Sequence, residues 1–198
     1  MRTLVASSLL LFPLALASQA HAARWVIDPE HSEVGFAVTH LMVSDVKGAF
    51  EKYQATVTAD DKDPLSAVVD VAIDVASVDT RSKRRDDSLR GKDFFDVTKH
   101  PTMTFKTTRT EAGEKPNTFK VTGDLTIRGV TKPVVLQVEV SEVWLDPWSK
   151  RAHRGVKAST VIARRDFGMT FQSKMDHGGV VVGEDVRIFI EADFVKQP

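Results

Sequence analysis

The stretch FKVTGDLTI, residues Phe119–Ile127, decides the fold because apolar or small residues alternate strictly with polar ones along it. The residues on the apolar parity are Phe119, Val121, Gly123, Leu125 and Ile127. A period of two is that of a β-strand with one face buried and the other in water, whereas a helix repeats every 3.6 residues. This stretch is therefore predicted to be a half-buried strand.

The same period of two recurs along most of the chain. It predicts eight strands, at residues 32–40, 46–58, 66–78, 102–109, 118–127, 133–145, 153–164 and 184–195. Turn signals such as Asp63-Pro64 and Gly178-Gly179 separate them. One short helix is expected at about 80–89, where the alternation stops and Asp79 or Thr80 can cap an N-terminus.

Eight sequential strands joined mostly by short turns predict an all-β fold in one domain. An eight-stranded antiparallel barrel leaves no unpaired edge, which makes it the favoured closure, and a β-sandwich is the alternative. A barrel of this size either fills its interior with side chains or holds one small ligand.

The charge balance and the cysteine content exclude several functions. Lysine plus arginine number 27 and aspartate plus glutamate number 27, so the chain has no net field to attract nucleic acid. No cysteine is present, which removes disulfides, thiolate nucleophiles and cysteine-based metal centres. We expect no nucleic-acid partner, no cofactor and no metal.

The first 22 residues are predicted to be a signal peptide. Arg2 precedes an apolar stretch, and Ala20-His21-Ala22 has the small-x-small pattern of a cleavage site, with cleavage expected before Ala23. The mature domain, 23–198, contains no run of about 20 apolar residues and so no expected membrane span. In a bacterium these features predict a periplasmic protein.

Motifs spread over nearly the whole mature chain carry a family resemblance. They are Trp25-x-Ile27-Asp28-x-x-His31-Ser32-x-Val34-x-Phe36-x-Val38-x-His40, Val46-x-Gly48-x-Phe50, Ser77-Val78-Asp79-Thr80, Asp87-x-Leu89-x-x-x-Asp93-Phe94-Phe95-Asp96, Pro101-x-Met103-x-Phe105, Gly123-x-Leu125-Thr126-x-x-Gly129-Val130-Thr131-x-Pro133 and Arg165-x-Phe167-Gly168. In this order they resemble the YceI-like family of exported, lipocalin-like barrels that bind polyisoprenoids. The resemblance implies an apolar tunnel for an isoprenoid or fatty chain and no established catalytic residue.

A long hydrocarbon offers almost no hydrogen-bonding groups, so its binding site needs an apolar wall rather than a polar motif. The candidate wall residues on strands are Phe36, Val38, Phe50, Val71, Ile73, Phe105, Val121, Leu125 and Ile127. Candidates from the helix and loops, to line or cover an opening, are Leu89, Phe94, Phe95, Phe167 and Met169. For each of these the alternative is an ordinary core residue.

Polar contacts to a ligand head group are predicted at three positions. His40 falls on an apolar parity, and Arg84 and Arg85 lie near the start of the expected helix, where an anion is favoured. The alternative for the two arginines is a solvated helix face, because aspartates surround them.

Asp28, His31 and Ser32 invite an acid–base or metal interpretation, but a turn in which Asp28 and Ser32 satisfy backbone groups explains them better. His31 and His40 are nine residues apart and so fall on opposite faces of a regular strand, which makes them a poor chelating pair. Arg164-Arg165-Asp166 is expected to form a surface or rim ion pair.

The sequence thus predicts a non-enzymatic protein that stores, shields or carries a long isoprenoid such as a quinone or a polyprenyl phosphate. Two alternatives stay open: an enzyme acting on such a lipid, and an interaction module with a filled barrel. A homodimer is an assembly that the sequence leaves open.

Overall fold

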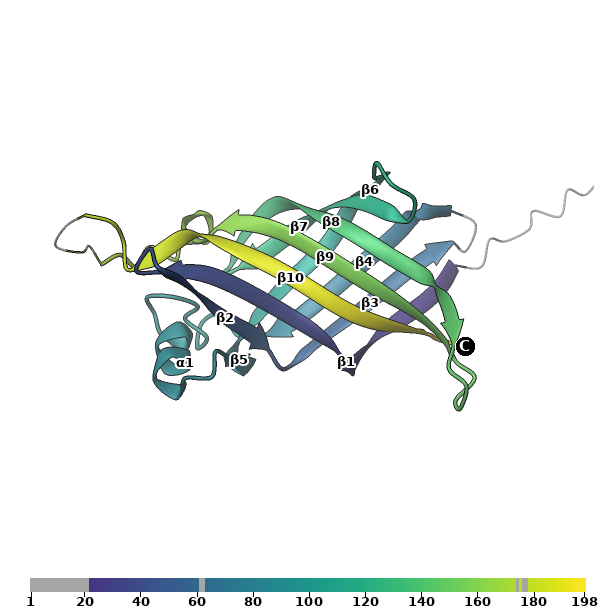
Figure 1. Cartoon of the computed structure of the whole chain (residues 1–198), viewed down its shortest axis with the longest axis horizontal. Coiled ribbons are helices and arrows are strands. Elements are labelled where there is room, and N and C mark those ends of the chain that lie inside the picture. The colour runs from purple at the N-terminus through teal and green to yellow at the C-terminus, as the bar shows by residue number, and fades with distance from the viewer. Residues whose placement is uncertain (1–21, 61–62, 174, 176–177) are drawn as a thin grey trace, which may run out of the picture.

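The structure is a computed structural model that describes residues 22–60, 63–173, 175 and 178–198. Apart from Ala22, the predicted signal peptide lies outside the described residues. Ten strands, one α-helix and two short 3-10 helices make up the described part (Figure 1). The strands are β1 (Ala22–His40), β2 (Ser44–Phe50), β3 (Tyr53–Asp60), β4 (Asp63–Asp74), β5 (Val78–Asp79), β6 (Thr102–Ala112), β7 (Thr118–Ile127), β8 (Val130–Leu145), β9 (Ala152–Ala163) and β10 (Val182–Lys196).

Eight of these strands close into one antiparallel barrel. They pair in the order β10-β9-β8-β7-β6-β4-β3-β1, and the pairing of β1 with β10 completes the ring. The predicted all-β, eight-stranded antiparallel barrel is confirmed, and the β-sandwich alternative is wrong, because two separate sheets would lack the β1–β10 ladder. Closure leaves these strands without a free edge over most of their length.

The two remaining strands arise because β1 is longer than any one neighbour. Its first residues pair with β3, from Ala22↔Asp60 to Val26↔Thr56, and its second half pairs with β2. The predicted single strand 46–58 is therefore split at Glu51 and Lys52 into β2 and β3. In the same way, the 3-10 helix η1 (Val75–Ser77) separates β4 from the two-residue β5.

Alternation of burial along the strands follows the period seen in the sequence. On β4 the odd-numbered residues from Ala67 to Ile73 are half-buried and the even-numbered ones are exposed, and β8 shows the reverse parity from Val134 to Val140. Inward-facing residues in a solid core would be fully buried. Their incomplete burial here indicates that they border open space inside the barrel.

The helix α1 (Lys83–Arg90) begins three residues later than predicted. The chain turns first at Arg81, whose φ of 62° lies in the left-handed region, and Ser82 is the N-cap. One Asp86 carboxylate oxygen accepts hydrogen bonds from both the backbone N–H (2.9 Å) and the hydroxyl (2.5 Å) of Thr80. Thr80 is thus held outside the helix by a buried side chain of the helix.

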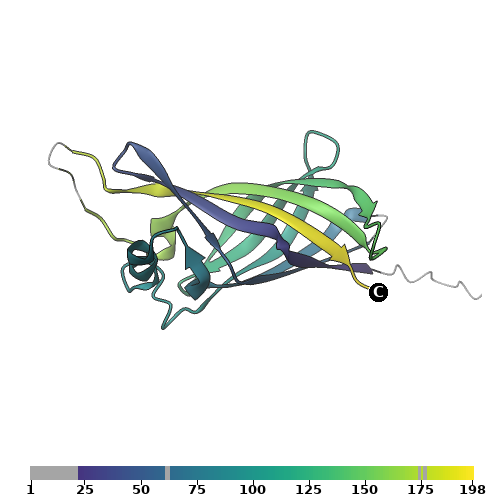
Figure 2. The same cartoon turned by 60° about the horizontal axis from the view of Figure 1, so that its bottom comes forward.

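One end of the barrel is closed by packed side chains. Phe167, Val75 and Val78 are between 0% and 1% exposed, the most deeply buried large residues described. They belong to a cluster that also contains Phe50 of β2, Met103 of β6 and Ile127 of β7. Figures 1 and 2 place α1 and β5 at this end, and the chain's C-terminus at the opposite end. We call it the closed end.

For Arg164 the prediction of a surface or rim ion pair is wrong, because the side chain is buried. It lies in the 3-10 helix η2 (Arg164–Phe167) and is 2% exposed. Its guanidinium donates to the carbonyl oxygens of Gly183 (2.9 Å) and Met169 (2.5 Å) and to Gln172 Oε1 (3.2 Å). Burial lowers its pKa, yet an arginine stays charged in proteins. Arg165 does form the expected exposed ion pair, with Glu184.

Candidate binding cavity

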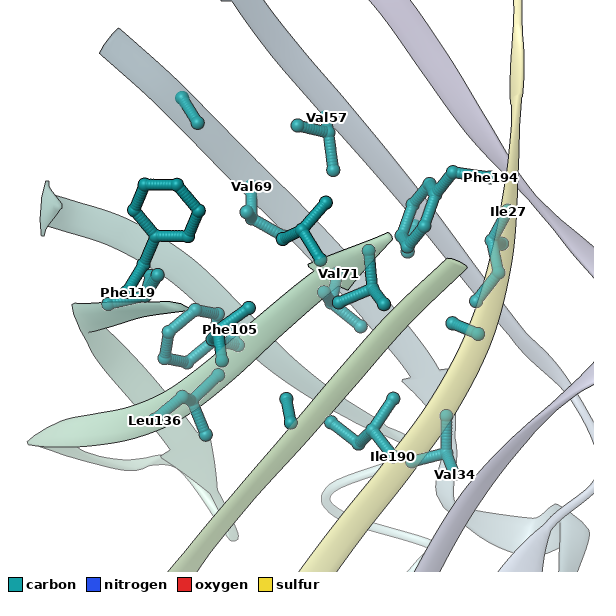
Figure 3. A pocket seen from close by; sticks show the side chains of 18 of the residues that line it. Ile27, Val34, Val57, Val69, Val71, Phe105, Phe119, Leu136, Ile190 and Phe194 are labelled. Carbon is teal, nitrogen blue, oxygen red and sulfur yellow. The ribbon is translucent and has the colours of Figure 1, made fainter. Parts of the chain in front are cut away.

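An elongated cavity of about 370 Å³ occupies the barrel interior, within the range typical of ligand pockets. All eight strands of the closed ring contribute to its wall. In Figure 3, Val71 of β4, Phe105 of β6, and Ile190 and Phe194 of β10 surround one common space. Its lining is dominated by valine, isoleucine, leucine and phenylalanine side chains.

Phe105 shows how the sequence shapes this wall. It lies between Val71 of β4 and Leu125 of β7 in the strand register, and it is 6% exposed. A Cβ added to Gly123 would lie 2.3 Å from Phe105 Cζ, so the ring crosses β7 where no side chain is present. Gly123, the glycine on the apolar parity of FKVTGDLTI, therefore leaves the space that the Phe105 ring occupies.

The cavity is sealed at the closed end and reaches solvent at the other. Phe50, Met103 and Ile127 line its inner end, and each is at most 7% exposed. At the far end the lining includes Pro64, Asn117, Ser141 and Glu142, all exposed residues near the β3–β4, β6–β7 and β8–β9 connections. We call this end the mouth. The shape is that of a tunnel with one polar opening.

Eight of the predicted wall residues line the tunnel: Phe36, Phe50, Val71, Ile73, Phe105, Val121, Leu125 and Ile127. They come from β1, β2, β4, β6 and β7, so the structure brings together residues distant in the sequence. Whether they touch a ligand stays a prediction.

The five candidates from the helix and loops do not line the tunnel. Phe167 and Met169 are members of the closed-end cluster, and Leu89 and Phe95 pack against it. Phe94 is 9% exposed and stacks with Phe171 at 5.2 Å between ring centroids. These residues close the barrel, because α1 and its flanking loops cover the end opposite to the mouth (Figure 2).

Val38 and His40 also fall outside the tunnel wall. They lie in the last part of β1, which pairs with β2 and β10 and extends past the ring formed with β3. The alternation of apolar residues along β1 continues to Val38 and His40, but the hollow interior of the barrel does not extend that far.

The predicted head-group residues Arg84 and Arg85 do not line the tunnel. Both belong to α1, at the closed end, whereas the polar mouth is at the opposite end (Figure 1). The Arg85 guanidinium is already engaged: it donates to Thr80 Oγ1 and to the Thr80 carbonyl oxygen, each at 2.7 Å. Arg84 is exposed on the helix, as its alternative interpretation predicted.

Sequence reasoning missed much of the wall, although the signal was present. The missed residues include Trp25, Ile27, Val34, Val69, Phe119, Val134, Leu136, Val138, Val140, Ile188, Ile190 and Phe194. Most of them occupy the alternating apolar positions of strands that the sequence predicts. Closure of the barrel makes every such parity face the same interior. Arg154, which also lines the tunnel, carries no such signal.

Asp28, His31 and Ser32 form the predicted turn. Asp28 accepts hydrogen bonds from the Glu30 N–H (3.0 Å) and pairs with His31 Nδ1 (2.9 Å), while the Ser32 hydroxyl donates to the Asp28 carbonyl oxygen (2.6 Å). The hydrogen bond with His31 lowers the pKa of Asp28, and the same contact raises the pKa of His31. The turn makes an irregularity in the β1–β10 ladder between Asp28 and Glu33.

This turn also contains a group of donor atoms with metal-ligand chemistry. Asp28, His31 and Asp193 offer three such atoms within 4.8 Å of one another. Asp193 already pairs with His153 Nδ1 at 2.8 Å, so the carboxylates of the group each have a histidine partner. The second oxygen of Asp193, Oδ1, is buried and has no hydrogen-bond partner.

Tyr53 places one polar group in the tunnel wall. Its hydroxyl donates to the Ser32 carbonyl oxygen at 2.6 Å, and burial raises its pKa. The phenol is therefore a neutral hydrogen-bond donor whose partner is the backbone of the neighbouring turn.

Fold and cavity together define a class: a lipocalin-like antiparallel barrel whose apolar interior opens at one end. The family model of the YceI-like domain matches residues 25–194, and the chain belongs to this family. None of the helices in the described part of the chain is long and apolar enough to cross a membrane.

Three known proteins illustrate the relationship. The protein YceI of Shigella flexneri is 38% identical over 184 residues, which cover 91% of each chain. The crystal structure of BcnA from Burkholderia cenocepacia has a TM-score of 0.73 at 27% identity, covering 84% of this chain and 98% of that one. A polyisoprenoid binding domain from Saccharophagus degradans shares the fold, with a TM-score of 0.66, 14% identity and coverage of 87% and 98%.

Proposed function

We propose that this protein binds a long-chain isoprenoid lipid, of the quinone or polyprenyl phosphate type, and stores or carries it in the periplasm. The observation that carries the proposal is the apolar tunnel, closed at one end and open at a polar mouth. The polyisoprenoid-binding description of the Saccharophagus domain supports the same class of ligand. Export by a cleaved leader over residues 1–22 is part of this proposal, supported by the sequence pattern alone.

The tunnel favours long chains for an energetic reason. Burying a methylene group contributes about 0.8 kcal/mol, whereas association costs on the order of 4–15 kcal/mol in lost freedom. A chain of about ten buried carbons gains roughly 8 kcal/mol and only just meets that cost. Longer chains are therefore retained, and short ones exchange freely.

A binding role without catalysis fits the placement of the polar groups. Asp28 and His31, whose mutual hydrogen bond shifts both pKa values, belong to a surface turn in which the His31 side chain is 70% exposed. The Tyr53 hydroxyl in the wall is occupied by a backbone carbonyl oxygen. Catalytic acids and bases must instead lie within reach of the reacting atoms. An enzyme acting on such a lipid is the second candidate.

A chain-length series tests the proposal. Isoprenoid alcohols and quinones of increasing length compete with a fluorescent fatty-acid probe for the purified protein. Affinity is expected to rise about tenfold for every two methylene-sized groups until the tunnel is full, and then to level off. Affinity independent of chain length would contradict a tunnel-bound chain.

The same samples separate the two candidate functions. Lipid bound for a long incubation is extracted and its mass is compared with that of the lipid added. Recovery of unchanged lipid supports a carrier, and conversion in step with protein concentration establishes the enzyme instead.

A further inference from the structure

Among the described residues that line the tunnel, Arg154 is the one cation. It lies in β9, two residues after the strand begins at the β8–β9 connection, and its side chain lines the cavity with the exposed mouth residues Ser141 and Glu142. Its strand partner Phe194 also faces the cavity. The guanidinium carbon lies 5.6 Å from the centroid of the Trp25 ring. Arg154 thus sits at the wall near the mouth.

The Arg154 Nε lacks the acceptor that a buried donor normally has. This Nε is buried and has no hydrogen-bond partner, and no ion pair among residues 22–60, 63–173, 175 and 178–198 includes Arg154. A buried donor without an acceptor costs free energy comparable to a lost hydrogen bond. By contrast, Arg85 and Arg164 each have several protein acceptors.

A second cation reinforces the positive charge. Lys196 Nζ lies 5.7 Å from the same Trp25 ring centroid, so two cationic side chains share one indole. Three acidic side chains lie in the same region. Asp60 and Glu142 line the cavity, and Glu142 Oε1 accepts from Asn117 Nδ2 (3.0 Å). Asp193 pairs with His153 through Oδ2 (2.8 Å), while its buried Oδ1 has no hydrogen-bond partner. The face of the ring attracts each cation.

We propose that Arg154, oriented by Trp25, binds the anionic head group of the amphiphile whose chain fills the tunnel. A planar guanidinium matches phosphate and carboxylate oxygens in bidentate geometry, and it does so best where water is scarce. The chemical class is therefore a long apolar chain with a phosphate or carboxylate at one end. The inference rests on the proposed function and refines it, because it favours polyprenyl phosphates or fatty acids over neutral quinones.

Matched pairs of probes test this assignment. Geranylgeranyl monophosphate is compared with geranylgeraniol, and palmitate with hexadecanol, so that chain length is constant within each pair. The intact protein is expected to bind the anionic member at least tenfold more tightly at low salt. The substitution Arg154→Gln is expected to weaken binding of the anionic member about 10- to 100-fold, the usual range for a charge-assisted hydrogen bond, and to leave the neutral member unchanged. The two pairs distinguish the phosphate source from the carboxylate source.

Two further variants make the result specific. Arg151→Gln removes the same charge from an exposed residue of the neighbouring connection that does not line the cavity, and it should leave both affinities unchanged. Arg154→Lys keeps the charge without the bidentate geometry and should restore part of the preference. Thermal unfolding of each variant shows that the fold is retained.

Three results of these binding measurements would contradict the head-group site or the carrier function. Equal affinity of the intact protein for both members of each pair would overturn the head-group site while leaving the carrier function standing. An equal loss for both members in Arg154→Gln would also overturn it, because the residue would then act only as wall. If neither the alcohols nor the anions bind, the proposed function itself fails.

Discussion

The substitution Phe105→Asp is expected to abolish lipid uptake. Phe105 lies at the middle of the tunnel wall, between Val71 and Leu125, and is 6% exposed. An unpaired carboxylate there would lose its hydration when a hydrocarbon chain enters, and burying it without a partner costs several kcal/mol, on the order of the whole free energy of binding. Uptake of a fluorescent long-chain lipid by the purified variant measures the effect. The exposed substitution Glu139→Ala should leave uptake unchanged.

A second pair of variants guards against simple unfolding of Phe105→Asp. Val71→Trp adds volume on the inner face of β4, where the side chain is only half-buried, and should exclude long chains while the protein stays folded. Val68→Trp makes the same change on the outer face of the same strand, where Val68 is 45% exposed. Equal uptake by these two variants would count against a chain inside the barrel.

Phe167→Ala is expected to destabilise the protein by about 3–5 kcal/mol, the usual range for removing a buried phenylalanine. Phe167 is 1% exposed, and it packs with Val75 and Val78 in the cluster that closes the barrel. Loss of its ring leaves a cavity at the one end of the barrel where side chains fill the space. Urea unfolding, compared with the intact protein under the same conditions, measures the change.

The control for this prediction is Val161→Ala on β9. Val161 is 57% exposed, and its truncation should change stability by no more than about 0.5 kcal/mol. A loss below about 1 kcal/mol for Phe167→Ala, well short of the usual core range, would show that the closed end is loosely packed.

Local patterning predicted the barrel because each strand buries one face. The period of two in FKVTGDLTI reappears as alternating burial in β7, and eight ranges of this kind correspond to the eight strands of the ring. The break at Glu51 and Lys52 was not predictable in this way, because it results from β1 exchanging one partner strand for another. The alternation of apolar and polar residues along a strand does not depend on which distant strand it pairs with.

The site was predictable only in its strand-borne part. Phe105 and Phe167 have the same side chain, yet one borders a hollow and the other fills a cluster. The difference depends on which end of the barrel α1 covers, which no local pattern records. Similarly, Arg85 and Arg154 are equal in charge, but only the three-dimensional structure brings Arg154 onto Trp25 at the mouth.

Native mass spectrometry of freshly isolated protein tests most directly the claim that a hollow apolar barrel holds a lipid chain. The polypeptide is expected to carry one noncovalent adduct with the mass of a long-chain amphiphile, which organic extraction removes and which added lipid restores. A mass equal to that of the bare polypeptide, unchanged after incubation with long-chain isoprenoids and fatty acids, would contradict it.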